Sequence, residues 1–68
     1  MNDDVLNMSL RKFLKKVGVT SQREIENAVK AALESGRLRG SETLKAQVRL
    51  TVPEAGLDAV IDGAIELE

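Results

Sequence analysis

The chain has 68 residues, with 10 Lys and Arg against 11 Asp and Glu, and contains neither His nor Cys. This length holds one small domain, and a composition of 43% apolar and 31% charged residues is typical of a globular protein. Without His and Cys the chain lacks the usual ligands of zinc, copper, haem and iron–sulfur centres, and it cannot form Ser–His or Cys–His nucleophile pairs. We therefore expect no metal, no cofactor and no enzymatic activity.

The beginning of the chain does not have the pattern of a secretory signal. Such a signal starts with basic residues and continues with about 7–15 apolar ones. Here Asp3 and Asp4 come first, and no apolar run is long enough for a signal or for a membrane span. We expect a cytoplasmic protein that does not bind membranes.

The first predicted element is a helix over residues 3–17. Asn2 is a favourable N-cap, and Asp3 and Asp4 suit the positive end of a helix. Gly18 can supply the left-handed conformation that often ends a helix. Apolar residues at helical spacing fill an arc of about 100°; they are Leu6, Leu10, Phe13, Leu14 and Val17.

A second helix is predicted over residues 22–35. Ser21 and Glu24 have the spacing of a capping box, in which each side chain accepts a hydrogen bond from the backbone N–H of the other residue. Gly36 ends the apolar pattern. The short connection over residues 18–21 predicts a helical hairpin or a more open helix–turn–helix crossing.

The hydrophobic period then changes from that of a helix to that of a strand. Residues 43–52 and 57–67 alternate between apolar and polar, and residues 53–56 contain the turn formers Pro and Gly. A four-residue turn pairs residues whose numbers add up to 109, so that Val48 lies opposite Ile61. This register places apolar or small residues on one face of an antiparallel hairpin.

A helix over residues 55–61 is an alternative, but the alternation continues to Leu67 and favours the strand. The predicted fold is α+β in the order ααββ, a single domain over residues 1–68 with two helices packed on one face of the hairpin. Both strands would be edges, so self-association through them is possible. The predicted core is Leu6, Leu10, Phe13, Leu14, Val17, Ile25, Val29, Leu33, Leu44, Val48, Leu50, Ile61 and Ile65.

Charge is distributed unevenly along the chain. Residues 1–23 contain five basic and two acidic residues, whereas residues 50–68 contain five acidic residues and no basic one. The basic side chains of the first helix span about 140° on the side opposite its apolar arc, and Met8 lies among them. The candidate binding residues are Met8, Arg11, Lys12, Lys15, Lys16 and Arg23.

A basic stripe beside an adaptable Met side chain suits an acidic protein partner. We therefore predict a small, non-enzymatic interaction module that uses this face of the first helix. Two alternatives stay open: a nucleic-acid-associated protein that uses the same stripe, and a solvated helix face with no binding role. The absence of Trp and Tyr, which would stack on bases, and the acidic pI of 5.4 disfavour nucleic acid.

The run from Met1 to Glu26 and the acidic end Ile65–Glu68 resemble a family of small, uncharacterised proteobacterial proteins. The resemblance covers the whole chain. It implies a small bacterial cytosolic protein and, since the function of the family is unknown, it assigns no catalytic or binding residues.

Overall fold

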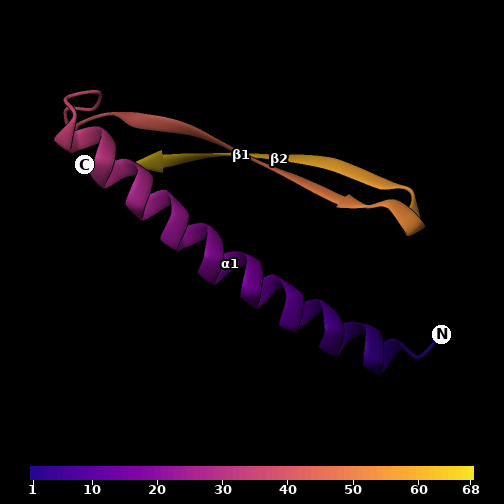
Figure 1. Ribbon diagram of the computed structural model, residues 1–68. Coiled ribbons are helices and arrows are strands. Elements are labelled where there is room, and N and C mark those ends of the chain that lie inside the picture. Colours follow the sequence, from indigo (N-terminus) through magenta and orange to yellow (C-terminus); the bar gives the residue numbers. More distant parts are fainter. The chain divides into compact units, whose positions relative to one another are not determined.

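The computed structural model describes all 68 residues and contains one helix and one β-hairpin (Figure 1). The helix is α1 (Asp3–Glu34), and the hairpin consists of β1 (Thr43–Val52), a short 3-10 turn η1 (Pro53–Ala55) and β2 (Leu57–Glu66). The chain divides into two compact units, residues 1–37 and residues 38–68. The predicted α+β class is confirmed, while the organisation as a single domain stays a prediction.

The prediction of two helices is wrong, because α1 continues without interruption through residues 18–21. Ser21 lies inside the helix, and the predicted capping bonds between Ser21 and Glu24 do not form. Instead, the side-chain amide of Gln22 donates a hydrogen bond of 2.9 Å to the carboxylate of Glu26 one turn later. The helical hairpin and the helix–turn–helix crossing are therefore absent as well.

The cost of ending a helix explains why α1 does not break at Gly18. Each helix end leaves four backbone N–H or C=O groups without intrahelical partners. A glycine inside a helix costs only about 1 kcal/mol relative to alanine. A break over residues 18–21 would create two such ends, so the helix continues through the glycine.

Both ends of α1 are capped as the sequence indicates. The side-chain oxygen of Asn2 accepts hydrogen bonds from the backbone N–H of Asp4 at 3.0 Å and of Val5 at 3.2 Å. At the other end Gly36 has a positive φ of 80°. The N–H of Arg37 donates to the carbonyl of Ala32 at 2.9 Å, and the N–H of Gly36 donates to Leu33 at 3.2 Å. These two bonds are the Schellman arrangement, which satisfies the last carbonyl groups of the helix.

The predicted register of the hairpin is confirmed. β1 and β2 pair antiparallel from Thr43 opposite Glu66 to Val52 opposite Leu57. The turn between them closes through Gly56, which has a left-handed φ of 65° and donates its N–H to Pro53. β2 ends at Glu66, one residue before the predicted end.

Glu42 organises the loop that precedes β1. Its carboxylate accepts hydrogen bonds of 2.8–3.1 Å from the backbone N–H groups of Arg39, Gly40 and Ser41. Its carbonyl accepts a bond of 3.2 Å from the N–H of Leu67 at the open end of the hairpin. Glu42 thus connects the start of β1 to the residue that follows β2, a role that the sequence analysis missed.

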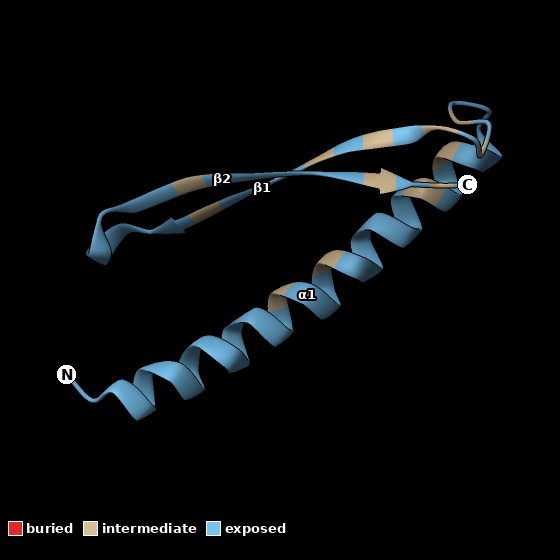
Figure 2. Ribbon diagram, turned by 180° about the vertical axis from the view of Figure 1, so that it is seen from behind, coloured by how far each residue is buried: buried red, intermediate tan, exposed pale blue.

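No residue of the chain is buried, as the absence of red in Figure 2 shows. The exposed fraction is 49% for Phe13 and 56% for Ile61, two of the predicted core residues. A single helix and a two-stranded hairpin each have an apolar face but no second layer of their own to cover it. Five predicted core residues are half-buried and the other eight are exposed; the half-buried ones are Val17, Val29, Leu44, Leu50 and Ile65.

Replacing Gly18 with alanine tests the continuity of α1. A Cβ atom at Gly18 meets no other atom within 4 Å, so we expect Gly18→Ala to stabilise the helix by about 1 kcal/mol. Thermal unfolding followed by circular dichroism measures this change. The matched control is Gly36→Ala, which should destabilise because Gly36 has a positive φ. Destabilisation by Gly18→Ala would contradict a continuous helix.

Acid should weaken the loop that Glu42 holds. The N–H groups of Arg39 and then Gly40 contribute most to lowering the pKa of Glu42 below its ordinary value of 4.5. Because the folded-state pKa is the lower one, the stabilisation is fully present above the ordinary value and is lost as the pH falls through the lowered pKa. Urea unfolding between neutral and acid pH measures the loss.

Glu42→Gln, which cannot ionise, should remove the contribution of this group to that pH dependence. Asp58 also has a lowered pKa, so Asp58→Asn serves as the control that leaves the Glu42 contribution in place. An NMR titration in which Glu42 ionises at or above its ordinary pKa would contradict the role of the loop.

Candidate functional site

The six predicted binding residues all lie on α1, and all of them except Met8 are cations. We call this set the basic face; it consists of Met8, Arg11, Lys12, Lys15, Lys16 and Arg23. Because α1 is continuous, Arg23 follows Lys12 by eleven residues and Lys16 by seven, spacings that return to within about 20° of the same side of a helix. From Arg11 to Arg23 the basic face is about 18 Å long.

The continuous helix also brings one further cation, Lys30, to the side of α1 that carries Arg23. Lys30 lies seven residues after Arg23 and falls on the same side of α1. However, Glu26 and Glu34 lie close to Lys30 on this side, so the positive potential of the second half is weaker. The concentrated part of the basic face is therefore the segment from Met8 to Lys16.

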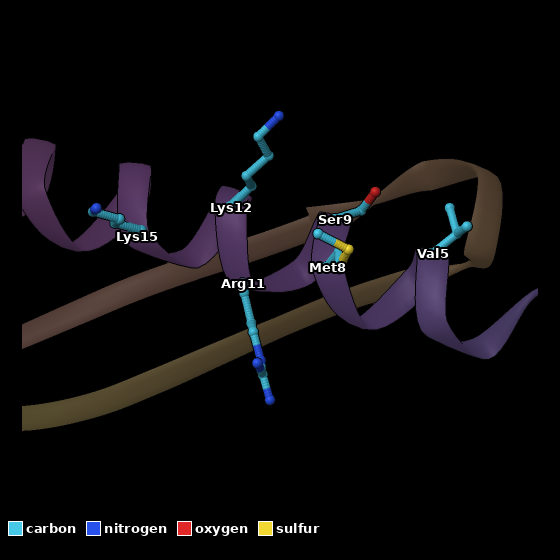
Figure 3. A pocket seen from close by; sticks show the side chains of 6 residues that line it. All are labelled: Val5, Met8, Ser9, Arg11, Lys12 and Lys15. Carbon is cyan, nitrogen blue, oxygen red and sulfur yellow. The ribbon is translucent and has the colours of Figure 1, made fainter.

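A shallow depression with a volume of about 470 Å³ overlaps this segment and extends from Val5 to Lys15 (Figure 3). Met8 is 72% exposed and Val5 is 60% exposed, so the depression offers apolar surface between cations. Arg11 and Lys12 extend to opposite sides of it in Figure 3. The lining residues are Val5, Met8, Ser9, Arg11, Lys12 and Lys15.

All six lining residues belong to one helix, which limits what the depression can bind. Small-molecule sites are concave and bury about 70–90% of their ligand. A single helix face cannot surround a ligand in this way. It suits an extended surface, such as a segment of another macromolecule, better than a metabolite.

The cations of the basic face are not neutralised by neighbouring carboxylates. The ion pair in the structure joins Arg49 to Asp58 on the hairpin, at 2.7 Å, and none involves α1. No acidic residue occurs between Val5 and Arg23. The basic face therefore keeps its charge available for a partner.

Two of the carboxylates of β2, those of Asp58 and Asp62, form hydrogen bonds within the hairpin itself. Arg49 donates two hydrogen bonds to Asp58, at 2.7 and 3.0 Å, and Gln47 donates one of 3.0 Å to Asp62. The hydrogen bonds from Arg49 lower the pKa of Asp58, and Asp58 in turn raises the pKa of Arg49. No three acidic side chains come close enough to hold a metal ion. The hydrogen bonds of Asp58 and Asp62 support the pairing of the two strands.

Comparison with known proteins identifies the chain at the level of family. A family model matches residues 1–68, and its description is a family of unknown function. The chain belongs to the DUF6494 family. The match confirms the resemblance and extends over every residue discussed above, but the family has no assigned ligand or reaction. No curated protein and no solved structure matches the chain. Its helix lacks the apolar character that crossing a membrane requires.

Proposed function

We propose that this protein is a small, non-enzymatic interaction module that binds an acidic protein partner through the basic face of α1. One observation carries the proposal. Arg11, Lys12 and Lys15 line the same depression as the exposed side chain of Met8, Lys16 follows on the same helix, and none of these cations forms an ion pair. Such a surface attracts an acidic segment over a distance and then offers it apolar contact.

Magnitudes indicate that both kinds of contact are needed. Four exposed ion pairs contribute together at most about 4 kcal/mol, which alone corresponds to a Kd of about 1 mM. Covering Met8 and Val5 can add about 1.5–3 kcal/mol for each side chain, before the entropic cost of association. The favoured partner is therefore an acidic segment that also carries apolar side chains.

Nucleic acid is the second candidate, because Arg23 and Lys30 extend the row of cations along the helix. Three features favour protein instead. Glu26 and Glu34 interrupt the row where further phosphates would lie. The chain has no Trp or Tyr to stack on bases, and its net charge is −1.

Reversing two charges of the basic face tests the proposal. We expect Lys12→Glu with Lys15→Glu to reduce partner affinity at least about tenfold, since each reversal replaces an attraction of up to about 1 kcal/mol with a repulsion. Affinity capture from the source organism, read by mass spectrometry, identifies the partner. Titration calorimetry with the purified partner then measures the affinity.

The matched control is Arg37→Glu with Lys45→Glu, which makes the same change in net charge away from the basic face. This variant should keep the partner. Met8→Ala should weaken binding with little change in its salt dependence. A charge-reversed variant that retains every partner, with its helix intact by circular dichroism, would place the binding surface elsewhere.

Fluorescence anisotropy with labelled DNA and RNA separates the two candidates. The proposal predicts no complex at about 150 mM salt, because four phosphate contacts alone give weak binding. For such contacts the logarithm of the binding constant falls with a slope near −4 against the logarithm of the salt concentration. A complex that persists at this salt concentration and is lost in the Lys12→Glu, Lys15→Glu variant would favour the nucleic-acid function.

A further inference from the structure

The apolar residues of α1 have no covering layer within their own unit. Residues 1–37 contain a single helix, and Leu6, Leu10 and Phe13 keep 41–49% of their surface exposed. An isolated helix in water gains little stability beyond its own hydrogen bonds. A helix of 32 residues with an apolar face therefore needs a partner surface.

The spacing of these residues has a symmetry that points to one particular partner. Successive positions along the stripe are separated by 4, 3, 4, 4, 4, 3 and 4 residues, a series that is the same in both directions. Its centre is Val19. We call these positions the apolar face of α1, in which Ser21 is the one polar member; they are Leu6, Leu10, Phe13, Val17, Ser21, Ile25, Ala28 and Ala32. Leu14, Val29 and Leu33 lie along one edge of this stripe and are not part of the symmetric series.

A palindromic spacing is what an isologous contact between two antiparallel copies of one helix requires. In such a contact, residue i of one copy meets residue j of the other, and j meets i. With the two-fold axis at Val19, each position of the apolar face meets another position of the apolar face. A parallel pairing in register would match each residue with itself and does not need this symmetry.

The sizes of the facing residues are also complementary. The antiparallel register sets Leu6 against Ala32 and Leu10 against Ala28. Phe13 then meets Ile25 near the centre. Leu6 and Leu10 thus face small side chains toward the two ends of the contact, where the helices can approach closely and interdigitate, whereas Phe13 and Ile25 fill the space nearer the centre.

Charge favours the same orientation. In the antiparallel register, residues 11–16 of one copy run beside residues 22–27 of the other. The first segment has a net charge of +4, and the second, which contains Glu24, Glu26 and Arg23, has a net charge of −1, so the two segments attract each other as wholes and not through paired side chains. Parallel helices would instead place two segments of net charge +4 alongside each other.

We infer that the partner of the apolar face is the same face of a second copy, so that the protein forms a dimer through two antiparallel α1 helices. The stripe advances 26 residues in seven turns, about 3.7 residues per turn, which is closer to an 11-residue than to a 7-residue repeat. The two helices would therefore not wind into a left-handed coiled coil. Most of the basic face lies on the opposite side of α1 and stays exposed in this dimer, whereas Lys16 borders the apolar face beside Phe13 and Val17.

Cysteine crosslinking tests the register directly, because the natural chain contains no cysteine. Equal amounts of Leu6→Cys and Ala32→Cys protein are mixed at about 0.5 mM and oxidised. We expect the mixed 6–32 disulfide to exceed the half share of all crosslinks that random pairing would give. In the antiparallel dimer, position 6 of one copy lies about 39 Å from position 6 of the other, far beyond the reach of about 7 Å between Cα atoms in a disulfide.

The matched control pair is Lys12→Cys with Glu26→Cys, which has the same register but lies on the other side of α1. For this pair, the mixed 12–26 disulfide should make up only the half share of all crosslinks that random pairing gives. Sedimentation equilibrium of the natural chain should give twice the monomer mass of 7.4 kDa. Leu10→Lys should return the mass to that of the monomer.

Three results would overturn the inference. A monomeric mass at about 0.5 mM would show that the apolar face is covered within one chain or not at all. A dimer in which the 6–6 disulfide dominates would be parallel. A dimeric mass with only random crosslinking would assign the contact to the strand edges of the hairpin. The Lys12→Glu, Lys15→Glu variant should still dimerise, so a failure of this inference is distinct from a failure of the proposed function.

Discussion

An amphipathic element is stable only where another apolar surface covers it, and neither unit of this chain supplies two layers. α1 has one apolar face, and the hairpin of β1 and β2 has another. A helix of 32 residues is about 48 Å long, whereas a strand of ten residues is about 33 Å long. A surface with the length of the hairpin matches only about two thirds of the helix. Because α1 is longer than the strands, the need to cover its whole apolar face is the central constraint on this protein.

The hairpin could be predicted almost residue by residue, because two independent signals agree on it. Alternation fixes which residues share a face, and the four-residue turn fixes the register. A shift of one residue would set Val48 opposite Val60 or Asp62, residues of the other face of β2. The sequence alone therefore predicts that Val48 lies opposite Ile61, and the structure has this pair.

The helix was predicted less well, because the signals near Gly18 and Ser21 are local and weak. Gly18 permits a helix end but does not require one, and a capping box contributes only about 1–2 kcal/mol. A break is favourable only when two short helices can bury their apolar faces on each other. Ser21 occupies a position of the apolar face of α1 at which such packing would need an apolar residue. The carboxylate of Glu42 was missed for a related reason: an acidic residue after Gly40 and Ser41 is a common loop sequence, and only the backbone geometry directs three N–H groups toward it.

The candidate site depends on the continuity of the helix more than on any single residue. The cations from Arg11 to Lys16 share a face in either interpretation of the sequence, since they lie within one helix in both. Arg23 joins them only because no break separates it from Lys16. The same continuity produces the palindromic spacing of the apolar face, whose centre lies where the break was predicted. One uninterrupted helix thus presents two faces on opposite sides, and the proposed dimer and the proposed partner would each use one without competing for the other.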